Sequence, residues 1–234
     1  DHALGTVSQF GAKAYTKYLT KLTSTPYRLP SAVEWQYAAN ANRKPTATPA
    51  GVFNKTAWTR NNSKTRQKVA TKFSNPWGIY DMQGNVAEWV LDGQGLIPST
   101  LLNKATLNSL TAVVWPTEYR KRAALGGSFL DLPKDCQTDS RKISGASLYE
   151  EEPMLPHSPH WTTSMAGQAI GFRIVRPFSR TIPQELANRY WEPDHPEITE
   201  ALKVKRRSGY ATRGLVDPEL PTAAKNFIQQ NKRP

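Results

Sequence analysis

The chain has 234 residues, 38% of them hydrophobic, and carries a formal net charge of +12 at pH 7. This length suffices for one sizeable core, and no apolar run approaches the length of a membrane span, so we expect no transmembrane segment. The single cysteine, Cys136, excludes an internal disulfide. Cysteine usage therefore does not indicate the compartment.

Aromatic and turn-forming residues set the expected architecture. Seven Trp, nine Tyr and seven Phe favour a core that depends on large aromatic side chains. Eighteen Pro and fourteen Gly favour long, defined loops over long helices. We therefore expect one loop-rich domain over residues 1–177, followed by a basic, proline-rich extension over residues 178–234.

A first helix is predicted over residues 10–22. Its apolar side chains recur at the spacing of one helical face, which predicts an amphipathic helix that packs on the core through this face. The residues of the face are Ala14, Tyr15, Tyr18, Leu19 and Leu22.

A second helix follows at once. Ser31 and Glu34 have the spacing of a capping box, in which each side chain satisfies a backbone N–H at the helix start. This predicts a helix from about Ala32 to Ala39, with Trp35 facing inward. Arg28 precedes it on an extended segment, because the neighbourhood of a proline disfavours helix.

The segment from Arg43 to Lys72 contains eight basic residues and no acidic one. Such a segment is typical of a solvated loop or of a surface that faces an acidic protein partner. Its aromatic residues are sparse, at Phe53 and Trp58, so the stacking platform that single-stranded nucleic acid requires is not indicated. Nucleic-acid binding is therefore not expected.

The stretch from Gly78 to Trp89 reads G-I-Y-D-M-Q-G-N-V-A-E-W and places Asp81 and Glu88 on either side of a glycine bend. Two carboxylates and inward-facing backbone carbonyls around a sharp bend suit a hard cation such as calcium. The same spacing is also typical of an ordinary turn, because Gly and Asn tolerate positive φ. The residues alone leave both interpretations open.

Together with three further segments in a fixed order, this stretch resembles the formylglycine-generating enzyme family, the sulfatase-modifying factor domain. The other segments are Tyr27–Ala39, Leu125–Leu130 and Gly171–Pro177. The resemblance covers roughly Gly5 to Pro177 and implies an α+β, loop-rich, C-type-lectin-like fold. It also implies a calcium ion bound by Asp81 and Glu88, with backbone carbonyls of Gly84 and Val86.

Enzymatic members of the family oxidise a substrate cysteine with a copper ion held by two thiolates, which follow a G-G-S segment. Here Ser128 ends the matching segment, and the two cysteine positions are Asp131 and Cys136. Thiolates select Cu(I), whereas a carboxylate is a hard ligand. The flanking His and Tyr are replaced by Leu132 and Asp135. We therefore expect no copper and no oxidase activity, and interpret Ser128, Asp131 and Cys136 as vestigial.

Packing explains the same segments without chemistry. Two glycines before Ser128 allow a buried strand to approach another backbone closely. The segment Gly171–Arg176 is predicted as a core strand with Phe172, Ile174 and Arg176 alternating, and Arg173 is expected to pair with a buried carboxylate.

Beyond Pro177, two short helices are predicted, Gln184–Trp191 and Ala223–Gln230, with extended chain between them. A segment of this kind does not build a core of its own and is expected to lie across its own domain or a neighbouring subunit. Aromatic residues dominate interface energetics, so Tyr190, Trp191 and Tyr210 are its expected anchors on a partner.

The favoured hypothesis is a non-catalytic accessory or scaffold subunit of a larger, extracytoplasmic assembly. It would contact other protein subunits through Arg43–Lys72 and the extension.

In the family, several strands precede the segment that resembles Gly5–Leu22, so we expect those strands to be lost or supplied by another chain. One alternative is an oxidoreductase of the formylglycine-generating type with an altered metal site. Another is a lectin-like ligand-binding module, which requires exposed aromatic side chains beside a polar groove.

Overall fold

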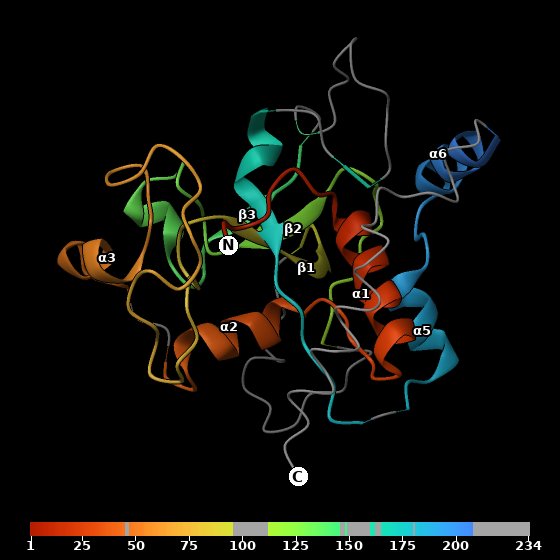
Figure 1. Cartoon of the computed structure of the whole chain (residues 1–234), viewed down its shortest axis with the longest axis horizontal. Coiled ribbons are helices and arrows are strands. Elements are labelled where there is room, and N and C mark those ends of the chain that lie inside the picture. Colours follow the sequence, from red (N-terminus) through yellow and green to blue (C-terminus); the bar gives the residue numbers. More distant parts are fainter. Residues whose placement is uncertain are drawn as a thin grey trace.

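The computed structural model describes residues 1–44, 47–95, 112–145, 148, 160–161, 165–179 and 181–207. Its centre is a four-stranded mixed sheet in the order β3-β2-β1-β4. The strands are β1 (Ala87–Gly93), β2 (Arg122–Leu125), β3 (Arg141–Ile143) and β4 (Ile170–Phe172). Strand β2 pairs antiparallel with β1 and β3, whereas β4 pairs parallel with β1. With the helices around it, the sheet confirms the α+β fold (Figure 1).

Strand β1 is the centre of the core, and all seven of its residues are buried. Its side chains alternate, as a strand covered on both faces requires. Ala87, Trp89 and Leu91 belong to one apolar cluster. Val90 belongs to a second, which contains Trp35. The Trp89 indole donates to the Val7 carbonyl at 2.8 Å, which satisfies its polar atom inside the first cluster.

Helix α2 (Ala32–Asn40) confirms the predicted capping box. The Ser31 hydroxyl accepts from the Glu34 N–H at 3.2 Å, and the Glu34 carboxylate accepts from the Ser31 N–H at 2.8 Å. Trp35 is 1% exposed, as predicted. Arg28 lies on extended chain and bridges to Val175.

Helix α1 (Gln9–Thr23) confirms the first predicted helix, but the predicted face is wrong. Tyr15 of that face is 44% exposed. The residues that the helix buries are Gln9, Phe10, Ala12, Lys13 and Thr16. Polar side chains occupy this face because each finds a partner there: Lys13, for example, binds the Asp194 carboxylate at 3.0 Å.

Two other predicted segments differ from the structure. The basic segment contains a short helix, α3 (Ala50–Thr56), whose Phe53 packs on Ala57 and Cys136. The predicted core strand at Gly171–Arg176 is shorter, because β4 ends at Phe172 and the residues Ile174 and Arg176 are exposed. Two 3-10 turns, η1 (Pro133–Cys136) and η3 (Met165–Ala169), complete the domain.

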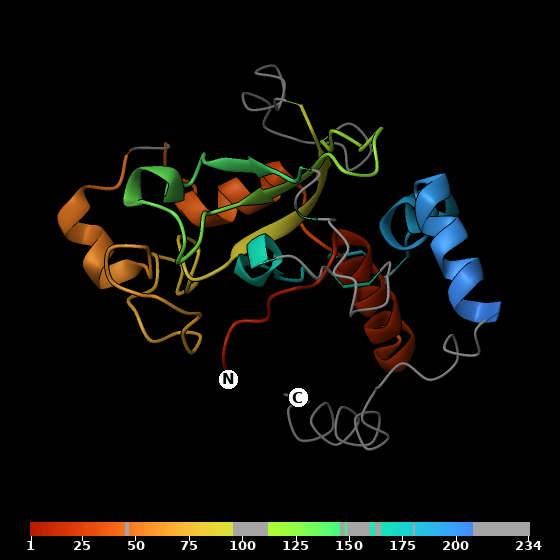
Figure 2. The ribbon, with the colours of Figure 1, turned by 90° about the horizontal axis from the view of Figure 1, so that it is seen from above.

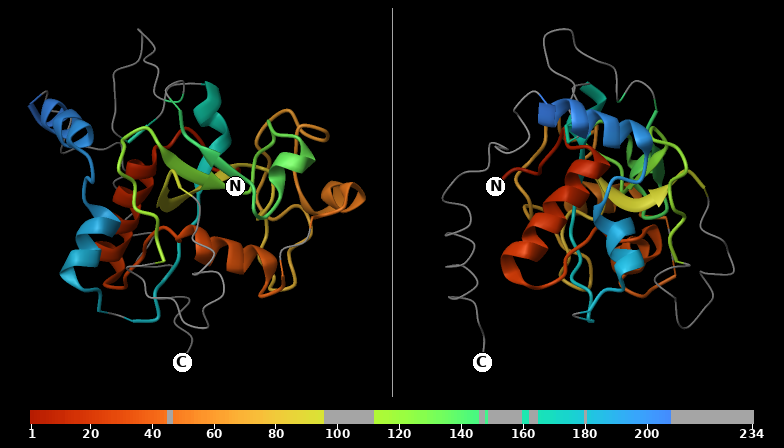
Figure 3. Two further views of the ribbon diagram at one scale, coloured as in Figure 1. Left: turned by 180° about the vertical axis from the view of Figure 1, so that it is seen from behind. Right: turned by 90° about the vertical axis from the view of Figure 1, so that its right-hand side faces the viewer.

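The extension packs on its own domain as far as the structure describes it. Helix α5 (Gln184–Trp191) was predicted, whereas α6 (Pro196–Arg207) forms where extended chain was expected. Figures 2 and 3 show α1 between the sheet and α5. Leu186 and Tyr190 belong to the main core cluster.

This packing corrects one predicted anchor. Tyr190 is 3% exposed, so it faces the domain and not a partner. The Trp191 indole donates to the Tyr27 carbonyl at 2.9 Å. Tyr210 and Ala223–Gln230 lie outside the described residues. Among the helices that are described, none has the length and apolar character needed to cross a membrane.

Candidate functional site

The bend before β1 is built from residues with left-handed backbone conformation. Asp81, Gly84 and Asn85 have φ values of 55°, 71° and 59°. Glycine is required at position 84, since a Cβ there would meet the backbone of Trp58. The Asn85 side chain is buried and accepts from the Gln67 N–H at 3.0 Å, which fixes the bend from within.

Glu88 lies on β1 at the end of this bend and is the acceptor of a buried junction. Its Oε2 accepts from the Trp35 indole at 2.7 Å and from Arg173 Nε. Its Oε1 accepts from Arg173 Nη2 at 2.7 Å. Burial alone would lower the Arg173 pKa, but the Glu88 carboxylate outweighs burial and raises it. The prediction that Arg173 pairs with a buried carboxylate is confirmed.

Two oxygens near this junction are candidate ligands for the predicted hard cation. Asp81 Oδ2 accepts from the Ala70 N–H at 2.7 Å, whereas Asp81 Oδ1 is buried and has no hydrogen-bond partner among the described residues. Leaving a buried acceptor without a donor costs free energy. Glu88 Oε1 accepts one hydrogen bond and keeps a second lone pair. Asp81 Oδ1 and Glu88 Oε1 are therefore the atoms that would hold the predicted calcium.

Within the described part of the chain, no group of three or more His, Cys, Asp or Glu side chains is placed to bind a metal. A calcium ion at Asp81 and Glu88 would therefore depend on backbone carbonyls for its remaining ligands, as predicted for Gly84 and Val86. Such an ion would stabilise the bend against the sheet. Calcium at this position stays a prediction.

The G-G-S segment is explained by packing. Gly126 and Gly127 have φ values of 88° and 65°. A Cβ on Gly126 would lie 2.7 Å from the Met82 carbonyl oxygen, and one on Gly127 would lie 2.6 Å from Cys136 Sγ. Real Cβ atoms do not approach so closely, so the close approach needs both glycines.

Asp131, which was predicted to stand at the first copper-cysteine position, is already bound by protein groups. Its Oδ2 accepts from the Ser128 hydroxyl at 2.6 Å. Lys142 of β3 lies 3.1 and 3.2 Å from the two carboxylate oxygens. The carboxylate thus takes part in a local ion pair at the edge of the sheet.

Cys136 stands at the second position and is fully buried. Its Sγ lies 3.6 Å from the Ser128 carbonyl oxygen, and it packs on Phe53 and Ala57. Burial raises the pKa of the thiol to about 12, and the nearby charge of Asp131 adds to this. The thiolate, which is the nucleophile and the metal ligand, is therefore scarcely populated at neutral pH.

A third charged centre was not indicated by the sequence analysis. Asp194, between α5 and α6, accepts two hydrogen bonds from Arg122 at 2.7 and 2.8 Å and one from Lys13 at 3.0 Å. The side chains of Lys13 and Arg122 are only 2% and 4% exposed. The signal in the sequence is the polar i, i+4, i+7 pattern of Gln9, Lys13 and Thr16. This pattern can mark a buried polar face.

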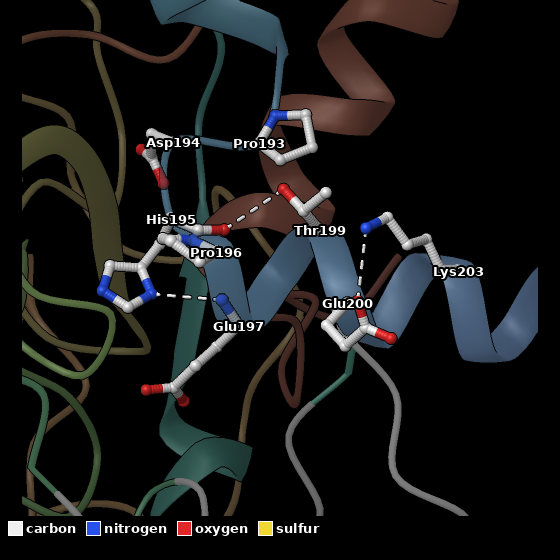
Figure 4. Close-up of a pocket in the computed structure, with 8 residues that line it drawn as sticks. All are labelled: Pro193, Asp194, His195, Pro196, Glu197, Thr199, Glu200 and Lys203. Carbon is white, nitrogen blue, oxygen red and sulfur yellow. Dashed lines mark hydrogen bonds and ion pairs between the residues drawn. The ribbon is translucent and has the colours of Figure 1, made fainter.

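A hollow of about 720 Å³ lies beside Asp194, at the start of α6 (Figure 4). It is remote in sequence from Asp81, Glu88 and Cys136, and several of its polar groups are paired with one another. His195 Nδ1 accepts from the Glu197 N–H at 3.3 Å, and Lys203 pairs with Glu200 at 3.3 Å. The Asp194 carboxylate is also engaged, by Arg122 and Lys13.

The family model of the sulfatase-modifying factor enzyme 1-like domain matches residues 1–178. The chain belongs to this family. The four segments that carry the resemblance thus identified the family correctly. The match covers both the bend with Asp81 and Glu88 and the segment from Ser128 to Cys136.

Two curated relatives are the serine/threonine-protein kinases pkn1 of Chlamydia pneumoniae and Chlamydia caviae. Each is 31% identical over 94 residues, which are 40% of this chain and 14% of the kinase. The match thus spans about a seventh of the length of these relatives. Kinase activity belongs to those proteins and is not carried over by this match.

Three solved structures are similar to this member of the family. PvdO from Pseudomonas aeruginosa is 23% identical with a TM-score of 0.52, over 71% of this chain and 59% of PvdO. CarF is 20% identical with a TM-score of 0.49, over 75% of this chain and 68% of CarF. Treponema denticola variable protein 1 is 26% identical with a TM-score of 0.46, over 65% of this chain and 49% of the Treponema protein. The likeness to PvdO supports the fold alone.

Proposed function

We propose that this chain is a non-catalytic member of the sulfatase-modifying factor family and acts as an accessory or scaffold subunit of a larger assembly. The observation that carries the proposal is the state of the two copper positions. Asp131 is ion-paired with Lys142, and Cys136 is a buried thiol. The glycines that pack the G-G-S segment are present, whereas only one of the two copper-binding cysteines is.

The energetics of copper binding support this proposal. A Cu(I) ion at these positions would need the Asp131–Lys142 pair to open and would gain only a hard carboxylate oxygen as ligand. The Cys136 thiol would also have to lose its proton against a pKa of about 12. Both requirements weigh against the oxidation that the enzymatic relatives perform.

The surface supports a role in binding. Exposed basic residues lie in α3 and on both sides of it, in a segment that contains no acidic residue. They are Arg43, Lys44, Lys55, Arg60, Lys64 and Lys68. Such a surface favours docking on an acidic protein partner. An extracytoplasmic location of the assembly is part of the same proposal.

The catalytic half of the proposal is tested by incubating the purified chain with Cu(I), oxygen and a sulfatase-type cysteine peptide. We expect no formylglycine by mass spectrometry, with a catalytic family member as the positive control. Asp131→Cys alone should also stay inactive, because Leu132 and Asp135 depart from the enzymatic pattern as well. Oxygen-dependent turnover by the wild type would overturn the proposal.

The scaffold half is tested by affinity purification of the tagged chain from its own cells at low salt. We expect an acidic protein that co-purifies, that is released by high salt and that is lost from the Lys64→Glu, Lys68→Glu variant. Protease added to intact cells should reach the tag if the assembly is extracytoplasmic. A chain that purifies alone, with the variant unchanged in behaviour, would contradict the scaffold role.

A further inference from the structure

Two exposed aromatic rings form a pair on the outer face of α2. Tyr37 lies on α2 and is 54% exposed, and Trp77, in the loop that follows α3, is 47% exposed. Their ring centroids are 5.1 Å apart, with an angle of 72° between the planes. Figure 1 shows α2 at the edge of the domain, below the sheet. We refer to Tyr37 and Trp77 as the aromatic platform.

The turn that carries Trp77 is held by one side chain. Asn75 Oδ1 accepts from the N–H groups of Trp77 at 3.0 Å and Ile79 at 3.1 Å. Asn75 Nδ2 donates to the carbonyls of Ala38 at 2.7 Å and Ala39 at 3.2 Å, in the last turn of α2. The Asn75 side chain thereby clamps the turn to the helix. The platform is pre-organised, so a ligand would not have to order it.

The platform presents hydrogen-bond donors but no carboxylate acceptor. The edge of one ring packs against the face of the other, and the outer faces of both rings are exposed. The Tyr37 hydroxyl and the Trp77 indole N–H are hydrogen-bond donors on these exposed side chains. No Asp or Glu occurs between Glu34 and Asp81. The platform therefore offers apolar surface and hydrogen-bond donors, without a carboxylate acceptor from the segment that builds it.

We propose that the aromatic platform binds a proline-rich peptide in the polyproline II conformation. Prolines lack an N–H and so need no acceptor, and the carbonyls of such a peptide are free to accept from the Trp77 indole. Aromatic-lined grooves are the surfaces on which proline-rich segments dock. Saccharide hydroxyls need acceptors as well as donors, which this segment does not supply through carboxylates.

Basic residues near the platform favour a particular composition of the peptide that binds there. Arg43 and Lys44 follow directly on the end of α2 and are exposed. They favour acidic residues next to the prolines of the peptide. The inference rests on the proposed scaffold role and names a class of partner for it.

The test uses the full chain and a dye-labelled peptide, acetyl-Glu-Glu-Pro-Pro-Leu-Pro-Pro-Leu-Pro, with binding measured by fluorescence anisotropy. We expect saturable binding that weakens at least about tenfold in Trp77→Ala and in Tyr37→Ala, since aromatic anchors dominate such interfaces. Phe73→Ala is the matched control, because Phe73 is 69% exposed and lies outside the platform. Thermal unfolding establishes that each variant is folded.

Two results would overturn the inference: no binding of the peptide by the wild type, or equal binding of a control peptide with alanine in place of proline. Binding of chito- or cello-oligosaccharides that depends on Trp77, without binding of the peptide, would assign the platform to saccharides instead. None of these results bears on copper or oxidase activity, so failure here is distinguishable from failure of the non-catalytic proposal.

Discussion

Two buried charge centres hold this molecule together, and they differ in how the sequence reveals them. At the Glu88 junction, one carboxylate binds Arg173 and the Trp35 indole. At the Asp194 junction, one carboxylate binds Arg122 and Lys13. The first lies within segments that carry the family resemblance. The second joins α1 and β2 to the extension after Pro177, which no motif describes.

The difference shows that the extension is part of the folded unit. Lys13 and Arg122 are almost fully buried, and a buried cation without a partner is strongly unfavourable. The carboxylate that pairs with both of them is Asp194, which lies between α5 and α6. The domain therefore depends on a segment beyond its family match.

The largest effect is expected from Asp194→Ala, which leaves two buried cations without their carboxylate. We expect a loss of about 3–5 kcal/mol in the free energy of unfolding, measured by urea denaturation. The matched control is Glu192→Gln, whose partner Lys17 is 34% exposed, and which should cost no more than about 1 kcal/mol. A loss in Asp194→Ala that is as small as that of the control would show that this junction with the extension is not needed for stability.

At the Glu88 junction, Glu88→Gln keeps the shape of the side chain but removes the charge that faces Arg173. We expect a loss of roughly 2–4 kcal/mol, because the guanidinium stays buried without its counter-charge. Glu118→Gln is the control, since its pair with Lys121 is exposed on both sides. A loss as small as that of the control would mean that Arg173 finds another partner.

Calcium is expected to distinguish the two junctions, because Asp81 Oδ1, near the Glu88 junction, is a buried oxygen without a hydrogen-bond donor among the described residues. Calcium in excess of its dissociation constant is expected to stabilise the chain by about 1–3 kcal/mol, and chelation should reverse the gain. Asp81→Asn should abolish the response, whereas Asp139→Asn, an exposed carboxylate elsewhere, should keep it. A melting temperature that changes neither with calcium nor with chelator would identify the bend as a plain turn.

The smallest effect is the pH dependence. Burial raises the pKa of the Glu34 carboxyl, but Arg28 outweighs burial and lowers it below its usual range. A lowered folded-state pKa stabilises the protein above the unfolded-state pKa of about 4.3, and this contribution is lost as the pH falls through the folded-state pKa. Stability should therefore fall in acid below about pH 5.

Glu34→Gln should show a shallower decline over the same pH range, measured by urea denaturation at several pH values. The raised pKa of Asp92, caused by burial, acts in the opposite direction, so its contribution falls as the pH rises from about 4. An unchanged pH profile in Glu34→Gln would place the acid sensitivity elsewhere.

Local signals predicted the parts of the fold that depend on local contacts. The Ser31–Glu34 capping box fixes the start of α2 through bonds three residues apart, so it is readable from the sequence. The buried face of α1 could not be predicted from the local sequence, because buried Lys13 pairs with a carboxylate that lies 181 residues further along the chain. Helix α6 was missed because prolines suggested extended chain, whereas Pro196 is its first residue, where proline is well tolerated.

The candidate site shows the same division. The positions of Asp81 and Glu88 were predicted from the motif, and the pairing of Arg173 with a buried carboxylate was predicted from its strand. That this carboxylate is Glu88, and that Asp81 Oδ1 lacks a donor, depends on where β4 meets β1. Such tertiary geometry has no signature in the local sequence.

The most direct test of the non-catalytic account is a Cu(I) titration at neutral pH against a competing chelator, with Cys136→Ser as the matched variant. The account predicts that the wild type and the variant retain the same small amount of copper, because the thiol is buried and protonated and its neighbour is a carboxylate. One equivalent of copper held by the wild type and lost in Cys136→Ser would contradict the account.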